Sequence, residues 1–348
     1  MTITLLRTVF LFLYGILPTF LIAQDTPLQA TYPADTGRTD TLIKIADAQH
    51  EALLPVSIIR GKQQGPVFTI VAGIHGYEYP PIIAVQRILA ELRPEALNGT
   101  LVIIPIANTL AFFGRAVFLN PQDKKNLNRV FPGDPQGSVT ERIADYIARH
   151  IIPGSDVFLD IHAGDAGEDL LPFVCYYDKK DSPEQLALAE KLTTAAGFRY
   201  NVVYPYTITA TEPAQYAFKH ATQQGVTALS IEAGKLGNVQ KDAVMLIRES
   251  IYNMLDEMDM YAAPSATDPG EQLWITGQHY VKSPEQGIFY SDLKSGDHVA
   301  KGQPLGYITD VFGKDREEIR SPADGIILYK TGTPPVNTGE TLYCIGTP

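Results

Sequence analysis

Short apolar runs alternate with helical patterns along most of the chain, and this alternation constrains the fold more than any other feature of the sequence. Strands that are buried on both faces are almost continuously apolar and rich in Val, Ile and Leu. Four runs have this character: residues 67–73, 101–107, 156–161 and 226–231. Because helical patterns separate them, we predict an α/β domain at residues 43–262, with a mixed, mainly parallel sheet flanked by helices.

Helix-start signals lie between these runs. Pro80 and Pro81 suit a first helical turn, where a missing N–H has no intrahelical partner to lose. Ser138 and Glu141 have the spacing of a capping box ahead of a second helical pattern. Pro183 opens a third.

The character of the sequence changes after Ala262. Residues 263–271 read as a linker, and the pattern V-x2-G-[QE]-x-L-x2-I then occurs twice, at 299–308 and 336–345. Repeated turn-and-strand units predict a smaller C-terminal all-β domain with internal pseudo-symmetry, at residues 272–348.

The first 23 residues carry one early cation, an apolar stretch and a small residue at the end. This pattern is typical of a secretory signal peptide, which predicts an exported protein, periplasmic or secreted. A membrane anchor is the alternative, but the stretch is shorter than a bilayer span and contains Gly15 and Pro18. Polar, turn-rich residues 24–42 are predicted to form an extended segment before the α/β domain.

Charge and cysteine content limit the partners. A formal net charge of -11 argues against binding to nucleic acid or to an anionic membrane, because either would need a basic face. We also expect no membrane insertion of the mature chain. Cys175 and Cys344 alone cannot build a disulfide framework or a cysteine zinc site, so a metal must use His and carboxylates. They could pair with each other, but we favour free buried thiols. The sequence leaves an oligomer possible.

Polar side chains follow the predicted strands. His75 and Glu78 come after the first run, Asn108 after the second, and His162 and Glu232 close the third and fourth. In open α/β sheets, sites assemble where the carboxyl ends of the strands meet. We therefore expect these side chains to share one rim of the sheet.

His75, Glu78 and His162 form the predicted metal site. The spacing His-x-x-Glu is common by chance, so a surface or helix-capping role for His75 and Glu78 is the alternative. The pair lies between a strand end and a proline-started helix, where both side chains can share one face, and this position favours a role as metal ligands. His162 could instead be a core histidine. Two imidazoles and one carboxylate leave a fourth position open, which is typical of one catalytic Zn²⁺ per chain.

Two further carboxylates accompany this site. Glu232 ends an apolar strand, where burying a lone carboxylate is unfavourable unless it has a partner or a function. It is therefore either a general base that later protonates the leaving group or half of a buried salt bridge. Asp160 lies two residues before His162, where it could orient a ligand or serve as a structural acceptor. In the cation-rich, loop-like stretch from Asn108 to Gly133, we assign Lys124 and Lys125 to the solvated surface.

In order along the chain, these motifs are G-I-H-G-x-E, N-x(n)-R, L-N-R-x-F-P-G, D-I-H and I-E-A-G, over about residues 65–235. Together they resemble the succinylglutamate desuccinylase/aspartoacylase family, a branch of the zinc carboxypeptidase superfamily. The resemblance implies a zinc-carboxypeptidase-like fold, with His75, Glu78 and His162 as zinc ligands.

The same resemblance assigns the other roles. It implies that Glu232 is the catalytic carboxylate, that Arg115 polarises the scissile carbonyl, and that Asn128 and Arg129 bind the substrate carboxylate. Asn126 stands where family members often have Asp, which leaves the role of that position open. The C-terminal β domain resembles a biotinyl/lipoyl-type barrel-sandwich but has no obvious lysine for modification. We therefore expect it to be a structural or gating lid.

Three functions remain. The first is an exported zinc amidohydrolase, or deacylase, that cleaves the C–N amide bond of a small N-acyl amino acid or related carboxylate-bearing amide. The second is a zinc carboxypeptidase acting on exported or cell-wall peptides. The third is a non-catalytic metal- or ligand-binding module.

Overall fold

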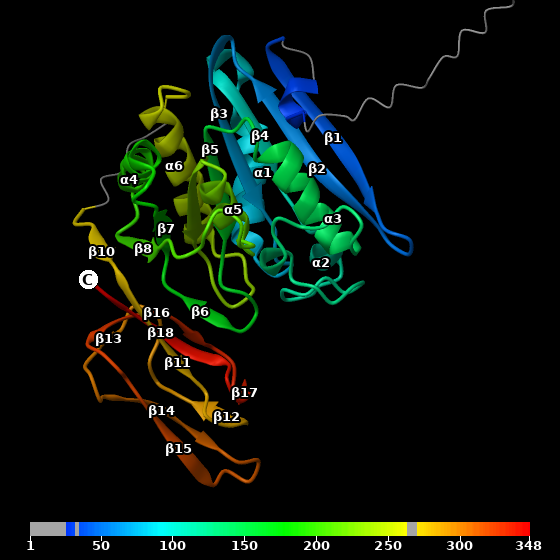
Figure 1. Cartoon of the computed structure of the whole chain (residues 1–348). Helices are drawn as coiled ribbons and strands as arrows, with labels where there is room; N and C mark the ends of the chain where they lie inside the picture. Colours follow the sequence, from blue (N-terminus) through cyan, green and yellow to red (C-terminus); the bar gives the residue numbers. More distant parts are fainter. Residues whose placement is uncertain (1–25, 32–34, 263–269) are drawn as a thin grey trace, which may run out of the picture.

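The computed structural model describes residues 26–31, 35–262 and 270–348 (Figure 1). The predicted signal peptide, at residues 1–23, lies outside these ranges, as does most of the predicted linker at 263–271. Among the helices of the described ranges, none is long and apolar enough to cross a membrane.

One nine-stranded sheet organises the larger part of the chain. Its strands run in the order β1-β2-β4-β3-β5-β9-β7-β8-β10, with parallel pairing from β4 through β3 and β5 to β9. The pairs β1–β2, β2–β4 and β7–β9 are antiparallel, so the sheet is mixed with a parallel centre, as predicted. Its strands are β1 (Gly37–Ala46), β2 (Glu51–Arg60), β3 (Gln63–Ala72), β4 (Asn98–Ile104), β5 (Val157–His162), β7 (Phe173–Asp178), β8 (Tyr200–Pro205), β9 (Thr227–Glu232) and β10 (Leu273–Ile275).

Helices cover both faces of this sheet (Figure 1). On one face, α1, α4 and α6 pack on a buried cluster that includes Val85, Leu159 and Ile247; on the other, α3 and α5 pack on a cluster that includes Phe158 and Ala217. The helices are α1 (Tyr79–Glu91), α2 (Thr109–Phe113), α3 (Val139–Tyr146), α4 (Pro183–Ala195), α5 (Ala217–Gln223) and α6 (Lys241–Glu257), with a π-helical turn at Ile147–Ile151 and 3-10 turns at Leu28–Thr31, Pro94–Ala96 and Leu127–Arg129. Neighbouring residues Phe158 and Leu159 enter opposite clusters because side chains alternate along a strand.

The predicted helix starts are present. Pro80 and Pro81 lie in the first turn of α1, and Pro183 opens α4. The capping box also forms, since the backbone N–H of Ser138 donates to Glu141 Oε2 at 2.9 Å. These local signals therefore mark the starts of α1, α3 and α4 correctly.

The C-terminal residues form two antiparallel sheets, β11-β18-β16-β13 and β15-β14-β12-β17. The predicted repeat forms equivalent units in the two sheets: β13 and β14 in the first copy, and β17 and β18 in the second. Val299 and Val336 are both buried in one core, and Gly302 and Gly339 both have positive φ in the turns. The strands are β11 (Gly277–Lys282), β12 (Gly287–Tyr290), β13 (His298–Val299), β14 (Pro304–Thr309), β15 (Asp315–Arg320), β16 (Gly325–Thr331), β17 (Pro335–Val336) and β18 (Thr341–Thr347).

Two strands cross between the two parts of the molecule. β10 pairs in parallel with β8 of the large sheet, and β6 (Glu168–Leu170) pairs with β16 of the C-terminal sheet (Figure 1). In addition, β1 begins at Gly37, ahead of the predicted domain start at residue 43. The sheets therefore do not divide at the predicted boundaries of 43 and 272. Cys175 and Cys344 are both free and buried, as favoured from the sequence.

Candidate active site

Strand ends bring the predicted site residues together. His162 and Glu232 close the adjacent parallel strands β5 and β9 and are partners in their register. β3 lies on the other side of β5, and the loop that follows it carries His75 and Glu78. Three loops that are far apart in sequence thus leave the sheet at the same edge, as expected from the sequence.

Close backbone packing requires a glycine beside His75. A Cβ on Gly76 would lie 2.3 Å from the carbonyl oxygen of Ala116 and 2.4 Å from that of Ala111. Gly76 N–H also donates to the carbonyl of Val117 at 3.2 Å. The His75 loop can therefore pack directly on the segment that contains Arg115.

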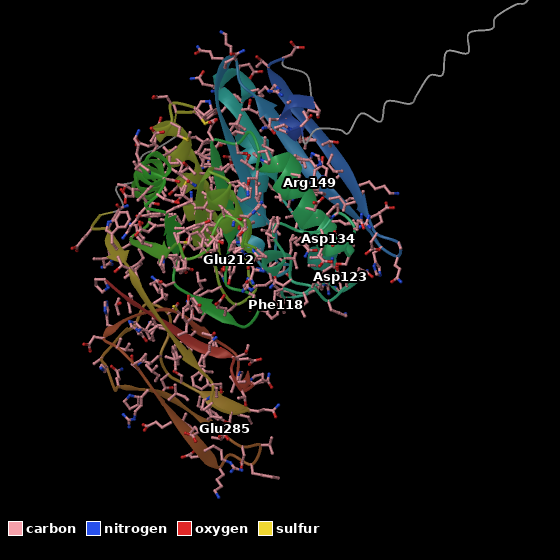
Figure 2. The ribbon with its side chains drawn as sticks, in the orientation of Figure 1. Phe118, Asp123, Asp134, Arg149, Glu212 and Glu285 are labelled. Atoms are coloured by element: carbon pink, nitrogen blue, oxygen red, sulfur yellow. The ribbon has the colours of Figure 1, made fainter. Side chains whose placement is uncertain are left out.

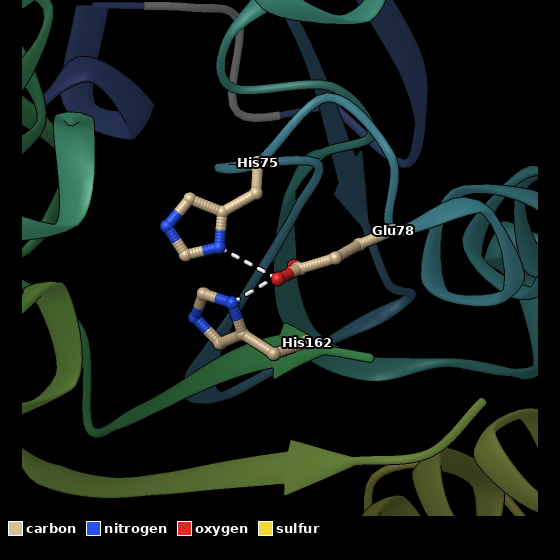
Figure 3. A group of neighbouring side chains, drawn as sticks. All are labelled: His75, Glu78 and His162. Atoms are coloured by element: carbon tan, nitrogen blue, oxygen red, sulfur yellow. Dashed lines mark hydrogen bonds and ion pairs between the residues drawn. The ribbon is translucent and has the colours of Figure 1, made fainter. Parts of the chain in front are cut away.

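The three predicted metal ligands form one compact group (Figure 3). His75 Nδ1 lies 2.6 Å from Glu78 Oε1, and His162 Nδ1 lies 2.9 Å from Glu78 Oε2. The imidazole ring centroids are 5.3 Å apart, and both Glu78 and His162 are buried. Both Nδ1 atoms therefore face the same carboxylate.

The outer nitrogen of each imidazole has its own partner. His75 Nε2 donates to Asn126 Oδ1 at 3.1 Å, and the same oxygen accepts from the backbone N–H of Asn128 at 2.8 Å. His162 Nε2 lies 3.0 Å from Asp160 Oδ1. Neither oxygen of Asp160 makes an aligned hydrogen bond within the described residues, so charge attraction dominates that contact. Each partner directs a Nδ1 atom toward Glu78.

The charges of this group are strongly interdependent. Burial alone would raise the pKa of Glu78, but the imidazoles of His75 and His162 outweigh it and lower the pKa to about 2. Burial opposes protonation of His162, yet Asp160 and Glu78 raise its pKa well above the usual value. The pocket thus holds an ionised carboxylate between two imidazoles, where a cation is electrostatically favoured.

Glu232 lies beside this group, and its pKa is shifted in the opposite direction to that of Glu78. Burial raises its pKa to about 8; His162 opposes the shift, while Glu78 and Asp160 add to it. No hydrogen bond or ion pair engages its carboxylate within the described part of the chain, so the salt-bridge alternative finds no partner there. A carboxyl that exchanges a proton near neutral pH suits general acid–base chemistry.

The two residues predicted to bind a substrate carboxylate differ in exposure. Asn128 is buried: its Oδ1 accepts from Ala217 N–H at 3.0 Å, and its Nδ2 lies 3.5 Å from His162 Nε2. Arg129 is exposed, and its guanidinium lies over the ring of Tyr216 at 4.6 Å. Asn128 thus anchors α5 next to the metal group, whereas Arg129 is the more available of the two for a ligand.

Arg115 and Asn108 occupy the loop that packs on Gly76. Arg115 has a left-handed backbone (φ 49°) and is exposed, and its side chain makes no hydrogen bond or ion pair within the described residues. Asn108 is a helix cap, because its Oδ1 accepts from Ala111 N–H at 3.1 Å. The structure places Arg115 on the loop beside the site without fixing its guanidinium.

Asp123 fixes the next part of this loop (Figure 2). Its carboxylate accepts from the N–H and hydroxyl of Thr140 at 2.9 and 2.8 Å, at the start of α3, and from Lys125 N–H at 3.1 Å. Lys125 pairs with Glu141 at 2.6 Å and is half-buried, whereas Lys124 is exposed, as predicted. The loop that presents Asn126 and Asn128 is therefore tied to a helix start.

Sequence reasoning missed two acidic residues of the site. Glu168 is hydrogen-bonded through its backbone to Asp165, after β5, and to Leu236, after β9. Burial raises the pKa of Glu168 well above its usual value; the carboxylates of Glu232, Asp165 and Glu78 add to the shift and His162 opposes it. The pKa of Asp165 is raised for similar reasons. The repeated acidic residues of D-A-G-E-D after His162 were the available signal, but their position depends on pairing with β16.

The donor set fits a metal ion. One ligand atom from each of His75, Glu78 and His162 lies within 4.8 Å of the other two, so a single cation can contact all three. Two imidazole nitrogens and one carboxylate oxygen are the donors of three-ligand catalytic zinc sites. The buried carboxylate between two rings also supplies the negative charge that such an ion requires.

Comparisons with known proteins identify the family of the chain. Residues 64–258 match the succinylglutamate desuccinylase/aspartoacylase catalytic domain. A curated relative, the N-alpha-acetyl-L-2,4-diaminobutyric acid deacetylase of Halomonas elongata, is 31% identical over 337 residues, which cover 92% of this chain and 95% of the relative.

Solved structures share the whole fold. The product-bound ectoine utilization protein EutE (DoeB) of Ruegeria pomeroyi superposes with a TM-score of 0.82 at 25% identity, covering 91% of this chain and 98% of that one. The succinylglutamate desuccinylase/aspartoacylase of Rhodobacter sphaeroides has a TM-score of 0.80 at 24% identity, over 91% and 98% of the chains, and is similar in fold. Both coverages extend beyond the catalytic match into the C-terminal sheets. The chain is thus a member of the succinylglutamate desuccinylase/aspartoacylase family.

Proposed function

We propose that this protein is a zinc-dependent deacylase that hydrolyses the amide bond of a small N-acyl amino acid. One observation carries the proposal: the group His75–Glu78–His162 lies beside Glu232, which has no partner within the described residues and ends the adjacent strand. Membership of a hydrolytic family and a curated relative named as a deacetylase support the same reaction. The likeness to zinc carboxypeptidases, inferred from the motifs, belongs to this proposal as well.

His75, Glu78 and His162 would hold the zinc ion through both Nδ1 atoms and the carboxylate. Asn126 and Asp160 keep the rings in the required orientation from their outer nitrogens. A bound zinc ion supplies Lewis acidity, which makes water more acidic and the amide carbonyl more electrophilic.

Glu232 carries the proton transfers. As a carboxylate it accepts a proton from the attacking water, and as a carboxylic acid it donates that proton to the leaving amine. The two steps leave Glu232 in its starting state. Its surroundings suit both, since burial favours the protonated form and His162 favours the ionised one.

Arginines orient the substrate in this proposal. Arg129, above Tyr216, binds the α-carboxylate with its planar fork, and buried Asn128 holds the turn that presents it. Arg115 lies on the loop packed against the His75 loop, from which it would stabilise negative charge developing on the carbonyl oxygen.

A Glu232→Gln variant tests the assignment. We expect hydrolysis of N-acetyl amino acids to fall by at least about a hundredfold, because the amide cannot accept the proton of water. Zinc content, measured by elemental mass spectrometry, should stay at that of the unaltered protein. Glu317→Gln, an exposed change in β15, is the matched control and should leave both values unchanged.

Substrate screening separates the competing functions. Release of acetate from N-acetyl amino acids supports the deacylase, whereas release of C-terminal residues from peptides would identify a carboxypeptidase. Zinc binding without turnover of either class would identify a binding module. Zinc as the metal is tested by removing bound metal with a chelator and comparing recovery with Zn²⁺, Mn²⁺ and Co²⁺.

We also propose that the protein is exported, on the pattern of residues 1–23. Expression of the full chain with a C-terminal tag, followed by mass spectrometry of its N-terminus, tests this. We expect a new N-terminus directly after Ala23 and protein outside the cytoplasm. An intact N-terminus on cytoplasmic protein would contradict export.

A further inference from the structure

Glu168 is held between the two segments that leave the catalytic strands. Its backbone N–H donates to the carbonyl of Asp165 at 3.2 Å, in the segment after His162. Its carbonyl accepts from Leu236 N–H at 2.9 Å, in the segment after Glu232. The backbone position of Glu168 is therefore fixed beside both functional strand ends.

Strand alternation separates the Glu168 side chain from that of its neighbour. In β6, Asp169 accepts from Lys235 Nζ at 2.7 Å and from Ser295 at 2.9 and 3.0 Å. Leu170, on the other face, is buried in the core. Glu168 and Leu170 are two residues apart and share a face, so Glu168 is on the face opposite the one on which Asp169 contacts Lys235.

No side chain of the described residues is directly bonded to the carboxylate of Glu168. It makes no hydrogen bond or ion pair there, although it is partly buried. The nearby charges include the carboxylates of Glu232, Asp165 and Glu78, with His162 as the opposing cation. Burying a carboxylate among others is unfavourable unless a cation joins them.

The opposite side of Glu168 is formed by the C-terminal sheet. Glu168 helps to raise the pKa of Tyr329 and of Cys344, after burial, so its charge reaches β16 and β18. In the register, Glu168 is opposite Thr331, two residues from Tyr329. Glu168 is thus flanked on one side by the segments that follow β5 and β9, and on the other by β16 of the C-terminal sheet.

We propose that Glu168 binds a cationic group on the side chain of the substrate, and so selects N-acyl diamino acids over N-acyl amino acids with neutral side chains. The inference rests on the proposed deacylase function. The substrate named for the curated relative has this chemistry, with one acetylated and one free amine. Arg129 and Glu168 would then bind opposite charges at two ends of one small molecule.

Matched substrates test the selectivity. Nα-acetyl-2,4-diaminobutyrate and N-acetyl-2-aminobutyrate share the carboxylate, the acetyl group and the carbon chain, and differ in the terminal ammonium. For the unaltered enzyme we expect the charged substrate to have a kcat/KM about tenfold to a hundredfold higher, as one charge-assisted hydrogen bond provides. Glu168→Gln should remove this preference, mainly through KM, and leave the neutral substrate within about twofold.

Two kinetic results would contradict the proposal, and each points to a different role for Glu168. An equal loss for both substrates would show that Glu168 acts on the catalytic group instead of the ammonium. A preference retained in Glu168→Gln would place the cation elsewhere. Glu317→Gln is the control variant, and an unchanged or raised Tm of Glu168→Gln is expected because a like-charge repulsion is removed.

A binding measurement keeps the test independent of turnover. Calorimetric titration of the zinc-loaded protein with 2,4-diaminobutyrate and with 2-aminobutyrate should show tighter binding of the diamino acid, and Glu168→Gln should abolish the difference. If neither substrate is hydrolysed but the difference is present, the deacylase proposal fails while the cation site stands. If the unaltered protein binds both equally, the Glu168 proposal is wrong.

Discussion

Asn126 connects two functions through one oxygen atom. Its Oδ1 accepts from His75 Nε2 and from the backbone N–H of Asn128, so the same amide orients a metal ligand and shapes the turn that carries Arg129. A carboxylate oxygen could make both contacts, but the amide makes them without adding negative charge. His162 has the contrasting partner, since Asp160 is ionisable. A neutral amide therefore orients His75, whereas an ionisable carboxyl group orients His162.

Replacing Asn126 should weaken zinc binding. We expect Asn126→Ala to lower zinc affinity about tenfold to a hundredfold, because His75 loses the acceptor that directs its Nδ1 atom. Competition with a chromophoric chelator measures the change. Asn126→Asp keeps the acceptor and should bind zinc at least as tightly as the unaltered protein. Equal affinity in Asn126→Ala would show that the loop orients His75 without this side chain.

At the scale of elements, Asp47 joins the β1–β2 turn to α3. Its carboxylate accepts from Gln49 and His50 N–H, both at 2.7 Å, and from Val139 N–H at 2.8 Å. Hydrogen bonds from Gln49 and His50 lower its pKa to about 2, with burial opposing and Val139 adding to them. One ionised side chain thus fixes both a hairpin and a helix start.

The pKa of Asp47 predicts a dependence of stability on pH. Because the folded pKa is lower than the unfolded one, ionised Asp47 stabilises the fold fully above about pH 4, and this contribution is lost as the pH falls toward 2. Asp47→Asn should lower Tm at pH 7, with the difference from the unaltered protein shrinking between pH 4 and 2. Circular dichroism melts measure it, with exposed Asp35→Asn as control. A difference that stays constant with pH would contradict this role.

Elements differ in how far the sequence predicts them. β3, β4, β5 and β9 are recognisable because burial on both faces leaves continuous apolar runs. β1 at the sheet edge alternates between exposed and half-buried residues, and polar Asp40 and Lys44 hide its extended pattern. His75 and Glu78 lie in the loop after β3 and His162 is the last residue of β5, so those positions could be found from predictable strands. Glu168 could not, because β6 has three residues and exists through its pairing with distant β16.

At the scale of the whole molecule, the two parts of the chain exchange strands beside the site. β6 leaves the catalytic part to pair with β16, and β10 joins the nine-stranded sheet. Asp169 secures this exchange, because it contacts Lys235 after β9 and Ser295 of the C-terminal part together. The position of Glu168 next to Glu232 therefore depends on both parts of the chain.

Loss of the Asp169 charge should loosen this junction. The carboxylate is buried, and attraction to Lys235 with hydrogen bonds from Ser295 lowers its pKa against the effect of burial. We expect Asp169→Asn to cost about 1–3 kcal/mol of stability and to speed amide hydrogen exchange in β6 and β16. Zinc content should not change, because the ligands come from the loop after β3 and the end of β5.

Exchange measured by mass spectrometry locates the effect. Asp310→Asn, which removes an exposed contact with Arg316 between β14 and β15, should alter exchange in that hairpin alone. If Asp169→Asn leaves β6 and β16 as protected as before, strand pairing by itself holds the junction. If exchange rises there and turnover falls while zinc stays bound, the second sheet contributes to catalysis by positioning Glu168, which is the arrangement that the two crossing strands imply.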